Sequence, residues 1–447
     1  PTRTSGTPPQ AGFFLPPTRN TMMPTPVDLL IEARWIIPVE PDDTTLEHHA
    51  IAVERGKIVA ILPLADARTR FTAAKTVSLP EHILIPGLVN LHCHAAMTLM
   101  RGLADDLPLM RWLQEAIWPT EARHTSHAFV RDGSLLAGAE MLRGGITTCN
   151  DMYFFPEATA EAFDRLGLRA VLGITLLEFP SQYAADADNY LRKGLATHDA
   201  WRGHPLIRFA LAPHAPYTVS NTSFERLGAL ADELELPIHI HLHETSGEIV
   251  DSLRDFGQRP ITRLESLGIL GPNLIGVHAV HLAPEDIERL ALHQCAIAHC
   301  PTSNMKLASG AAPVTQLLDH GLAVGIGSDG AASNNRLDLF REMHQASLLA
   351  KLSTSDASAL PARQALRMAT LNGARALGLD KEIGSLLPGK AADICAIRID
   401  DPDELPCFDP VSHVVYVLGR HAVSDVWVDG QQRVEHGKLL QITNTEL

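Results

Sequence analysis

The sequence lacks any apolar run long enough to cross a membrane, because no stretch approaches the roughly 18 consecutive apolar residues that a spanning helix needs. Near the N-terminus the short apolar run 12–15 has no basic start, so it does not resemble a signal peptide. The six cysteines are scattered without a Cys-X-X-Cys pair, which indicates reduced thiols. We therefore expect a cytoplasmic protein with no membrane partner.

An excess of positive charge is also missing, since 37 Lys and Arg residues face 52 Asp and Glu residues, for a formal net charge of -15. A nucleic-acid surface needs clustered Lys and Arg. This balance excludes a general nucleic-acid partner and favours a small-molecule substrate.

Residues 1–25 are rich in Pro and Thr and show no hydrophobic period. We expect them to be a disordered N-terminal extension. Met22 and Met23 offer a natural start of translation, so what precedes them is interpreted as an extension or an over-long start.

Strand-like segments occur near both ends of the chain, in residues 26–82 and 384–447. Short β segments need partners to bury their apolar faces, so we expect one small β-sandwich domain built from both chain ends. The segments with this pattern are 28–33, 50–54, 57–61, 392–397, 414–417 and 426–434.

Between these ends, in residues 83–383, apolar strands alternate with helix-length stretches. The stretches 126–143 and 222–236 carry apolar residues at helical spacing. This alternation predicts the α/β class and a (β/α)8 TIM barrel. The eight strand segments are 83–92, 146–152, 169–177, 207–214, 237–243, 273–280, 296–301 and 323–329.

Two histidines, His92 and His94, end the first of these strands. Side chains alternate along a strand, so both imidazoles face the same way and can reach one metal ion. The ends of barrel strands meet at one face, where the chemistry of such barrels lies. Metal-type residues recur at later strand ends: His214, His241, Glu244, His278 and Asp329.

The residue pattern leaves two choices open. In strand five, His239, His241 and His243 share one face, and in strand six either His278 or His281 could serve. Three imidazoles and a carboxylate around an open position form a catalytic site suited to zinc or iron.

A metal in such a site lowers the pKa of a bound water towards about 7. Glu244 is then left as a proton shuttle. Together these residues predict metal-assisted hydrolysis.

The chain resembles the amidohydrolase superfamily through His92-Cys93-His94, the run 241–244, His278 and Ser328-Asp329. The closing segment 384–393 resembles the return of that superfamily to its small β domain. Strand four, 207–214, has no lysine, so the resemblance is to the one-metal branch.

The finer resemblance is to the 5'-methylthioadenosine/S-adenosylhomocysteine deaminases, through residues 94–102, 112–121, 212–217 and 328–335. It implies one zinc ion per subunit, with iron as the alternative metal, and a homo-oligomer, dimer or tetramer. The implied metal ligands are His92, His94, His241 and Asp329. The implied catalytic residues are Glu244, which protonates the purine ring, His278, which orients the attacking water, and Asp329, which accepts its proton. The implied substrate contacts are Glu121 to the ribose, His214 to the purine and Trp112 as a pocket wall.

The implied reaction replaces the 6-amino group of an adenosine-type nucleoside and releases ammonia. The resemblance leads us to expect arginines near strand three that hold a homocysteine carboxylate. Residues 173–177 contain no arginine there; Arg192 is the nearest one downstream, and Arg101 is a possible substitute. This departure favours methylthioadenosine or adenosine. The alternatives are a guanine or cytosine deaminase, a triazine hydrolase, or a non-catalytic scaffold.

Overall fold

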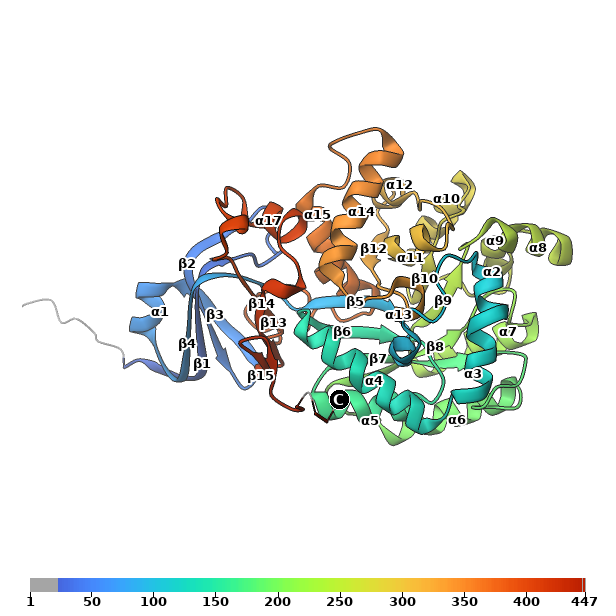
Figure 1. Cartoon of the computed structure of the whole chain (residues 1–447), viewed down its shortest axis with the longest axis horizontal. Helices are drawn as coiled ribbons and strands as arrows, with labels where there is room; N and C mark the ends of the chain where they lie inside the picture. Colours follow the sequence, from blue (N-terminus) through green and yellow to red (C-terminus); the bar gives the residue numbers. More distant parts are fainter. Residues whose placement is uncertain (1–22, 444, 447) are drawn as a thin grey trace, which may run out of the picture.

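The computed structural model describes residues 23–443, 445 and 446. Over these residues the strands form two eight-stranded sheets. Figure 1 shows one sheet built from the blue and red ends of the chain, beside a barrel built from its middle. The N-terminal extension expected over residues 1–25 lies almost entirely outside the described residues, and β1 begins at Thr25.

The sheet from the chain ends is joined at its centre, where β4 pairs antiparallel with β13. On the other side of β4, β1 pairs parallel with β4 and antiparallel with β2. This arrangement confirms a β domain made from both ends. In spatial order its strands are β16 (Lys438–Leu439), β15 (Gln431–Glu435), β14 (Val423–Val428), β13 (Ile394–Arg398), β4 (Phe71–Pro86), β1 (Thr25–Ile36), β2 (Leu46–Glu54) and β3 (Lys57–Pro63).

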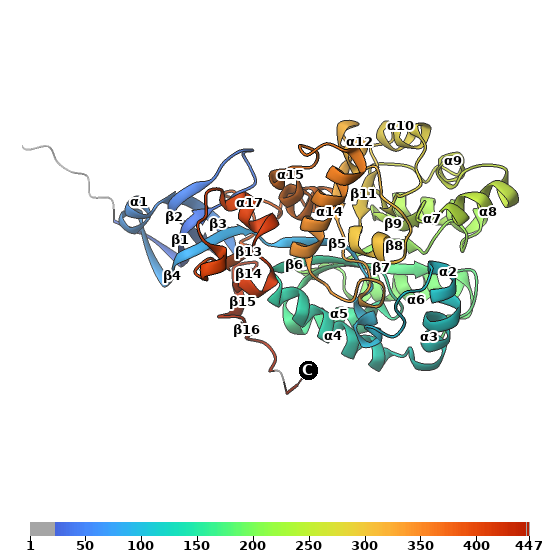
Figure 2. The ribbon, with the colours of Figure 1, turned by 45° about the horizontal axis from the view of Figure 1, so that its top comes forward.

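The second sheet is parallel and follows chain order, as the βα pattern predicts. It curls round so that the Asp329 amide, after β12, donates to the His92 carbonyl at 3.0 Å. The predicted (β/α)8 barrel is confirmed, and Figure 2 shows it from a second side. Its strands are β5 (Leu88–Cys93), β6 (Ile146–Asp151), β7 (Arg169–Leu176), β8 (Ile207–Pro213), β9 (Ile238–Leu242), β10 (Leu274–His278), β11 (Ala296–His299) and β12 (Ala323–Ile326).

Both predicted helical stretches are confirmed as α4 (His127–Arg143) and α7 (Asn221–Leu234). Each starts at a serine whose hydroxyl accepts a backbone N–H of the first turn, the usual N-cap arrangement. Along the described residues, no helix combines the length and the apolarity that crossing a membrane requires. The other α-helices are α1 (Leu64–Arg70), α2 (Leu109–Trp112), α3 (Trp118–His124), α5 (Pro156–Leu166), α6 (Ala187–Ala200), α8 (Ser246–Phe256), α9 (Pro260–Ser266), α10 (Pro284–Leu292), α11 (Pro301–Lys306), α12 (Val314–Asp319), α13 (Ala331–Asn334), α14 (Leu339–Thr354), α15 (Ala362–Arg367), α16 (Gly373–Ala376) and α17 (Pro410–Tyr416).

Two predicted strands differ from the structure. The run expected as one strand, 83–92, is divided at Gly87, and residues 83–86 end β4 in the outer sheet. A Cβ at Gly87 would lie 2.1 Å from the Thr147 hydroxyl oxygen, so only glycine fits at this crossing point. The expected strand 414–417 is instead the end of α17, because Pro410 at the first turn and the Asp409 N-cap start a helix there.

Apolar side chains fill the interior of the barrel below the polar C-terminal ends of its strands. Val89, Val171, Ala210, Ile275 and Val277 belong to one buried cluster. Val89 precedes His92 in β5, and Ile275 precedes His278 in β10. The polar groups at the strand ends therefore rest on a closely packed apolar floor.

A buried ion pair fastens the outer sheet to the barrel. The Arg169 guanidinium, at the start of β7, donates to both Asp393 oxygens at 3.1 and 3.2 Å. Asp393 precedes β13 and also accepts the Asp429 N–H at 2.7 Å. Both side chains are almost fully buried.

Removing one partner of this pair should cost about 3–5 kcal/mol, because the other charge is then buried alone. We expect Arg169→Ala to lower the free energy of unfolding by that amount in urea titrations. Arg208→Ala is the control, since its pair with Glu382 is exposed on both sides and should contribute about 0–1 kcal/mol. Similar losses in the two variants would contradict the account.

Candidate metal centre and active site

Four side chains from different strands converge at the C-terminal face of the barrel. One ligand atom from each of His92, His241, His278 and Asp329 lies within 4.8 Å of those of the other three. His94 adjoins them, since its Nε2 is 3.3 Å from Asp329 Oδ1, and His92 Nε2 is 3.2 Å from the same oxygen. The structure thus brings together all the residues predicted as metal ligands, with His278 beside them.

The imidazoles are held so that their Nε2 atoms face this centre. In each ring Nδ1 is hydrogen-bonded to a fixed neighbour. Where that neighbour is a carbonyl oxygen, which can only accept, Nδ1 must carry the proton. This leaves the Nε2 lone pairs of His94 and His241 free for a metal. The Nδ1 contacts are His92 to His239 Nε2 (3.0 Å), His94 to the Met152 carbonyl (2.6 Å), His241 to the His214 carbonyl (2.8 Å) and His278 to Asn304 Oδ1 (2.8 Å).

Asp329 is oriented from its other side. Its Oδ2 accepts the hydroxyls of Ser303 at 2.6 Å and Ser333 at 2.8 Å. Burial opposes ionisation of Asp329, yet His92 and His94 hold the pKa of this carboxyl well below its ordinary value. The centre therefore contains a fixed carboxylate.

The surrounding imidazoles differ in charge. Burial lowers the pKa of His92 to about 3, and it lowers the pKa of His241 well below its ordinary value. Burial alone would lower the pKa of His94, but the Asp329 carboxylate raises it to about 9. At neutral pH a proton on His94 therefore offsets the buried Asp329 carboxylate, and a cation bound at this position would take the place of that proton.

Glu244 follows β9 and stands at the edge of the cluster. Its Oε1 is 3.8 Å from His278 Nε2, and its side chain is almost fully buried. Burial raises the pKa of Glu244, which favours the protonated carboxyl that a proton donor needs.

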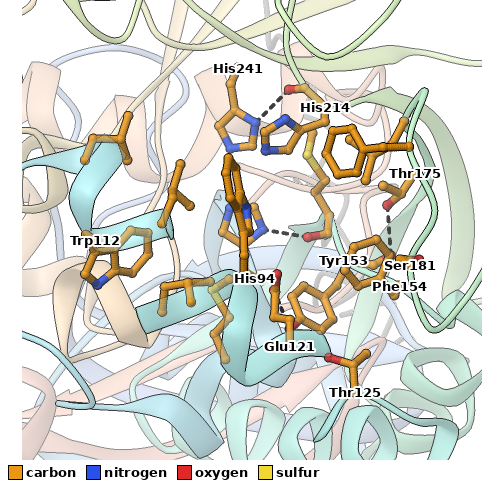
Figure 3. Close-up of a pocket in the computed structure, with 18 of the residues that line it drawn as sticks. His94, Trp112, Glu121, Thr125, Tyr153, Phe154, Thr175, Ser181, His214 and His241 are labelled. Atoms are coloured by element: carbon orange, nitrogen blue, oxygen red, sulfur yellow. Dashed lines mark hydrogen bonds between the residues drawn. The ribbon is translucent and has the colours of Figure 1, made fainter. Parts of the chain in front are cut away.

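The cluster opens into a cavity of about 550 Å³, within the about 300–1,000 Å³ typical of small-molecule sites. Its lining includes Glu244, His214, Trp112 and Glu121, so the structure places all predicted substrate contacts at one cavity. Figure 3 shows Trp112 on one side, with His94 and His241 between it and the aromatic residues opposite.

Glu121 belongs to α3, and its Oε1 accepts the Tyr153 hydroxyl at 2.7 Å (Figure 3). Burial raises the pKa of Glu121. Between α2 and α3, residues 113–117 form a π-helical turn, a feature frequent at functional sites.

The structure resolves the two choices that strand periodicity leaves open. His239 bonds to His92 behind the centre, and His243 bonds away from it, to the His281 carbonyl at 3.1 Å and the Ile261 amide at 3.2 Å. His281 Nε2 likewise contacts the Ser309 carbonyl at 2.7 Å. His241 and His278 are the histidines of their strands whose Nε2 faces the centre.

Several residues that support the site were missed in the sequence. Tyr153 and Ser303 hold Glu121 and Asp329, and Asp151 accepts the Ala95 N–H at 2.7 Å just after His94. Asp151 ends β6, so the strand-end rule that selected Asp329 would also have found it.

The donor set fits a divalent transition metal. Imidazole nitrogens with one carboxylate are ligands that zinc and iron share, and their directing hydrogen bonds are those of metal-binding histidines. The neighbouring cavity leaves a side open for substrate, as in catalytic rather than structural sites.

Residues 83–433 match the sequence model of the amidohydrolase family. The chain belongs to this family. It is 46% identical over 423 residues to a protein of Teredinibacter turnerae named 5-methylthioadenosine/S-adenosylhomocysteine deaminase, covering 95% of this chain and 96% of that one. Its place among the 5-methylthioadenosine/S-adenosylhomocysteine deaminases of the family confirms the resemblance seen in its motifs.

Solved structures of the family share the architecture. An adenosine deaminase from Xanthomonas campestris with bound zinc matches with a TM-score of 0.94 and 47% identity, over 95% of this chain and 96% of that one. The atrazine chlorohydrolase TrzN from Arthrobacter aurescens complexed with zinc matches with a TM-score of 0.87 and 26% identity, over 93% of this chain and 97% of that one.

Replacing His241 should remove the metal, whereas replacing His243 should not, because only His241 faces the centre. We expect His241→Asn to contain little zinc or iron when purified beside the wild type. His243→Asn is the matched control on the same strand and should retain the metal, at some cost in stability. Metal analysis by plasma mass spectrometry measures both, and metal loss in His243→Asn alone would contradict the assignment.

Proposed function

We propose that this amidohydrolase is a zinc-dependent deaminase that hydrolyses the 6-amino group of an adenosine-type nucleoside and releases ammonia. The observation that carries the proposal is the buried His–Asp cluster beside a cavity that also holds Glu244 and Glu121. The relatives named for this activity support it across nearly the whole chain.

His92, His94, His241 and Asp329 would hold one zinc ion, and iron is the alternative that the same donors accept. When bound, the metal supplies Lewis acidity that brings the pKa of a water towards about 7. The surrounding residues would bind and orient the nucleoside and transfer protons.

Two carboxyl groups divide the proton transfers. Glu244, whose pKa is raised by burial, donates a proton to the purine ring nitrogen beside the 6-amino carbon, so negative charge does not build up there. Asp329, kept ionised by His92 and His94, accepts the proton of the attacking water. His278, whose ring lies near both carboxyl groups, orients this water.

The cavity wall supplies the nucleoside contacts. The Glu121 carboxylate accepts hydrogen bonds from the ribose diol, a pair of donors that two oxygens can satisfy together. Burial lowers the pKa of His214 to about 4, so a neutral ring contacts the purine. Trp112 packs against the apolar faces of the nucleoside.

The lining of the cavity favours an apolar 5' group. Among the described residues that line the cavity, none is Lys or Arg. Arg101 bonds to Glu140 and to the Asn335 carbonyl instead, and Arg192 does not line the cavity. Trp118 and Phe179, which both line the cavity, meet edge to face with ring centroids 6.5 Å apart. A methylthio group suits this surface, whereas a homocysteine carboxylate finds no counter-ion.

The alternative reactions fit less well. A guanine or cytosine deaminase or a triazine hydrolase acts on a free base, which offers no ribose to Glu121 and Tyr153. A non-catalytic scaffold does not need the oriented histidines. Cytoplasmic location and a homo-oligomer remain predictions from composition and resemblance.

Purified enzyme should release ammonia from methylthioadenosine and adenosine, followed by the absorbance change from adenine to hypoxanthine. We expect kcat/KM for S-adenosylhomocysteine to be about 10- to 100-fold lower than for methylthioadenosine, because its carboxylate would be buried without a Lys or Arg partner in the described lining of the cavity. An adenosine with an uncharged 5'-butylthio group controls for length and should react well. Turnover of guanine or chlorotriazines without nucleoside turnover would overturn the proposal.

The role of Glu121 is testable with matched substrates. We expect Glu121→Gln to lower kcat/KM for adenosine about 10- to 100-fold, since hydrogen bonds to a charged group contribute about 1.5–3 kcal/mol. For 2',3'-dideoxyadenosine the same variant should change kcat/KM little, because the diol is absent. An equal loss on both substrates would show that Glu121 acts elsewhere.

A further inference from the structure

The loop that carries Glu244 has a strained backbone. His243, directly before it, adopts φ of +53°, in the left-handed region that few residues other than glycine occupy. Residues held there need a surrounding structure that enforces the conformation. The position of the Glu244 side chain depends on what holds this turn.

Glu248 supplies that hold from the first turn of α8. Its Oε1 accepts the His243 N–H at 3.0 Å and its Oε2 accepts the Glu244 N–H at 2.9 Å. The side chain is 6% exposed, so water does not replace these contacts. One carboxyl group thus fixes the two consecutive amides that flank the strained residue.

This contact differs from ordinary helix capping. In a capping box, the residue at the third helical position bonds to the N-cap amide. Here Thr245 is the N-cap and accepts the Glu248 N–H at 3.3 Å, while the Glu248 side chain passes over Thr245 to the two residues before it. Its target is the loop of Glu244 rather than the helix end.

The rest of His243 is held from the opposite side. Its carbonyl accepts the N–H groups of Val280 and His281, each at 3.0 Å. Its ring bonds to the His281 carbonyl and the Ile261 amide. The peptide group that joins His243 to Glu244 is thus held at its carbonyl by the segment after β10 and at its N–H by Glu248.

We propose that Glu248 is a positioning residue. By holding the turn, it keeps the Glu244 carboxyl within hydrogen-bond reach of the ring nitrogen that Glu244 protonates. The inference rests on the proposed function of Glu244 as proton donor. Glu248 belongs neither to the described lining of the cavity nor to the His–Asp cluster, so it would act through the backbone of the turn.

The test exploits the chemistry of an amide. In Glu248→Gln one acceptor oxygen becomes an NH2 group that faces a backbone N–H, so one of the two bonds is lost and a donor meets a donor. We expect kcat to fall about 10- to 100-fold, because a displacement of a catalytic group by about 1 Å causes losses of this size. KM should change less than about threefold.

Glu404→Gln is the matched control. Glu404 is also 6% exposed and also sits at the third position of a helical turn, where its carboxylate accepts the Asp401 N–H at 3.4 Å, but it lies in the C-terminal part of the chain outside the cavity. This variant should retain the wild-type kcat.

A double mutant separates positioning from general damage. In the Glu244→Gln background, adding Glu248→Gln should slow the enzyme less than about twofold, because the group being positioned is already disabled. A full multiplicative loss in that background, or an unchanged kcat in Glu248→Gln alone, would overturn the inference.

Hydrogen exchange gives a readout that does not need turnover. The amides of His243 and Glu244 should exchange faster in Glu248→Gln than in the wild type, with metal content unchanged, and equal exchange would overturn the inference. If the wild type deaminates no adenosine nucleoside, the proposed function fails, while the exchange result still decides whether Glu248 holds the turn.

Discussion

The Asp329 carboxylate facing His92 and His94 is the interaction on which the rest of this structure depends. A carboxylate and several imidazoles, all buried, are stable together only when a cation or a shared proton offsets their charge and desolvation. The parallel barrel brings these groups together, because its strands end at the same face and the segment after β12 bonds to the end of β5. The apolar floor beneath then excludes water from one side of the centre.

Much of this could be predicted from the sequence, because the period of two along a strand and the position of strand ends are local properties. They were enough to select His92, His94 and Asp329 and the barrel itself. They could not choose among His239, His241 and His243, which share one strand face and differ only in depth. The helix over residues 410–416 was missed for a related reason, since its β-branched residues outweighed a proline and an aspartate at its start.

Most of the supporting residues could not be predicted, because tertiary packing selects them, and Asp151 at the end of β6 is the exception. Tyr153 reaches Glu121 from a different element, and Glu248 reaches back over its own helix start to the amides of His243 and Glu244. The cavity is similar in this respect, since the lack of Lys and Arg among its described lining residues appears only once distant segments are assembled.

The central claim is that a single divalent cation occupies the His–Asp centre. Anomalous diffraction from crystals of the protein, recorded at the absorption edge of zinc or iron, tests it most directly. The account predicts one peak, about 2.0–2.2 Å from nitrogen atoms of His92, His94 and His241 and an oxygen of Asp329. Two peaks in the centre, or a lone peak coordinated by other side chains, would contradict it.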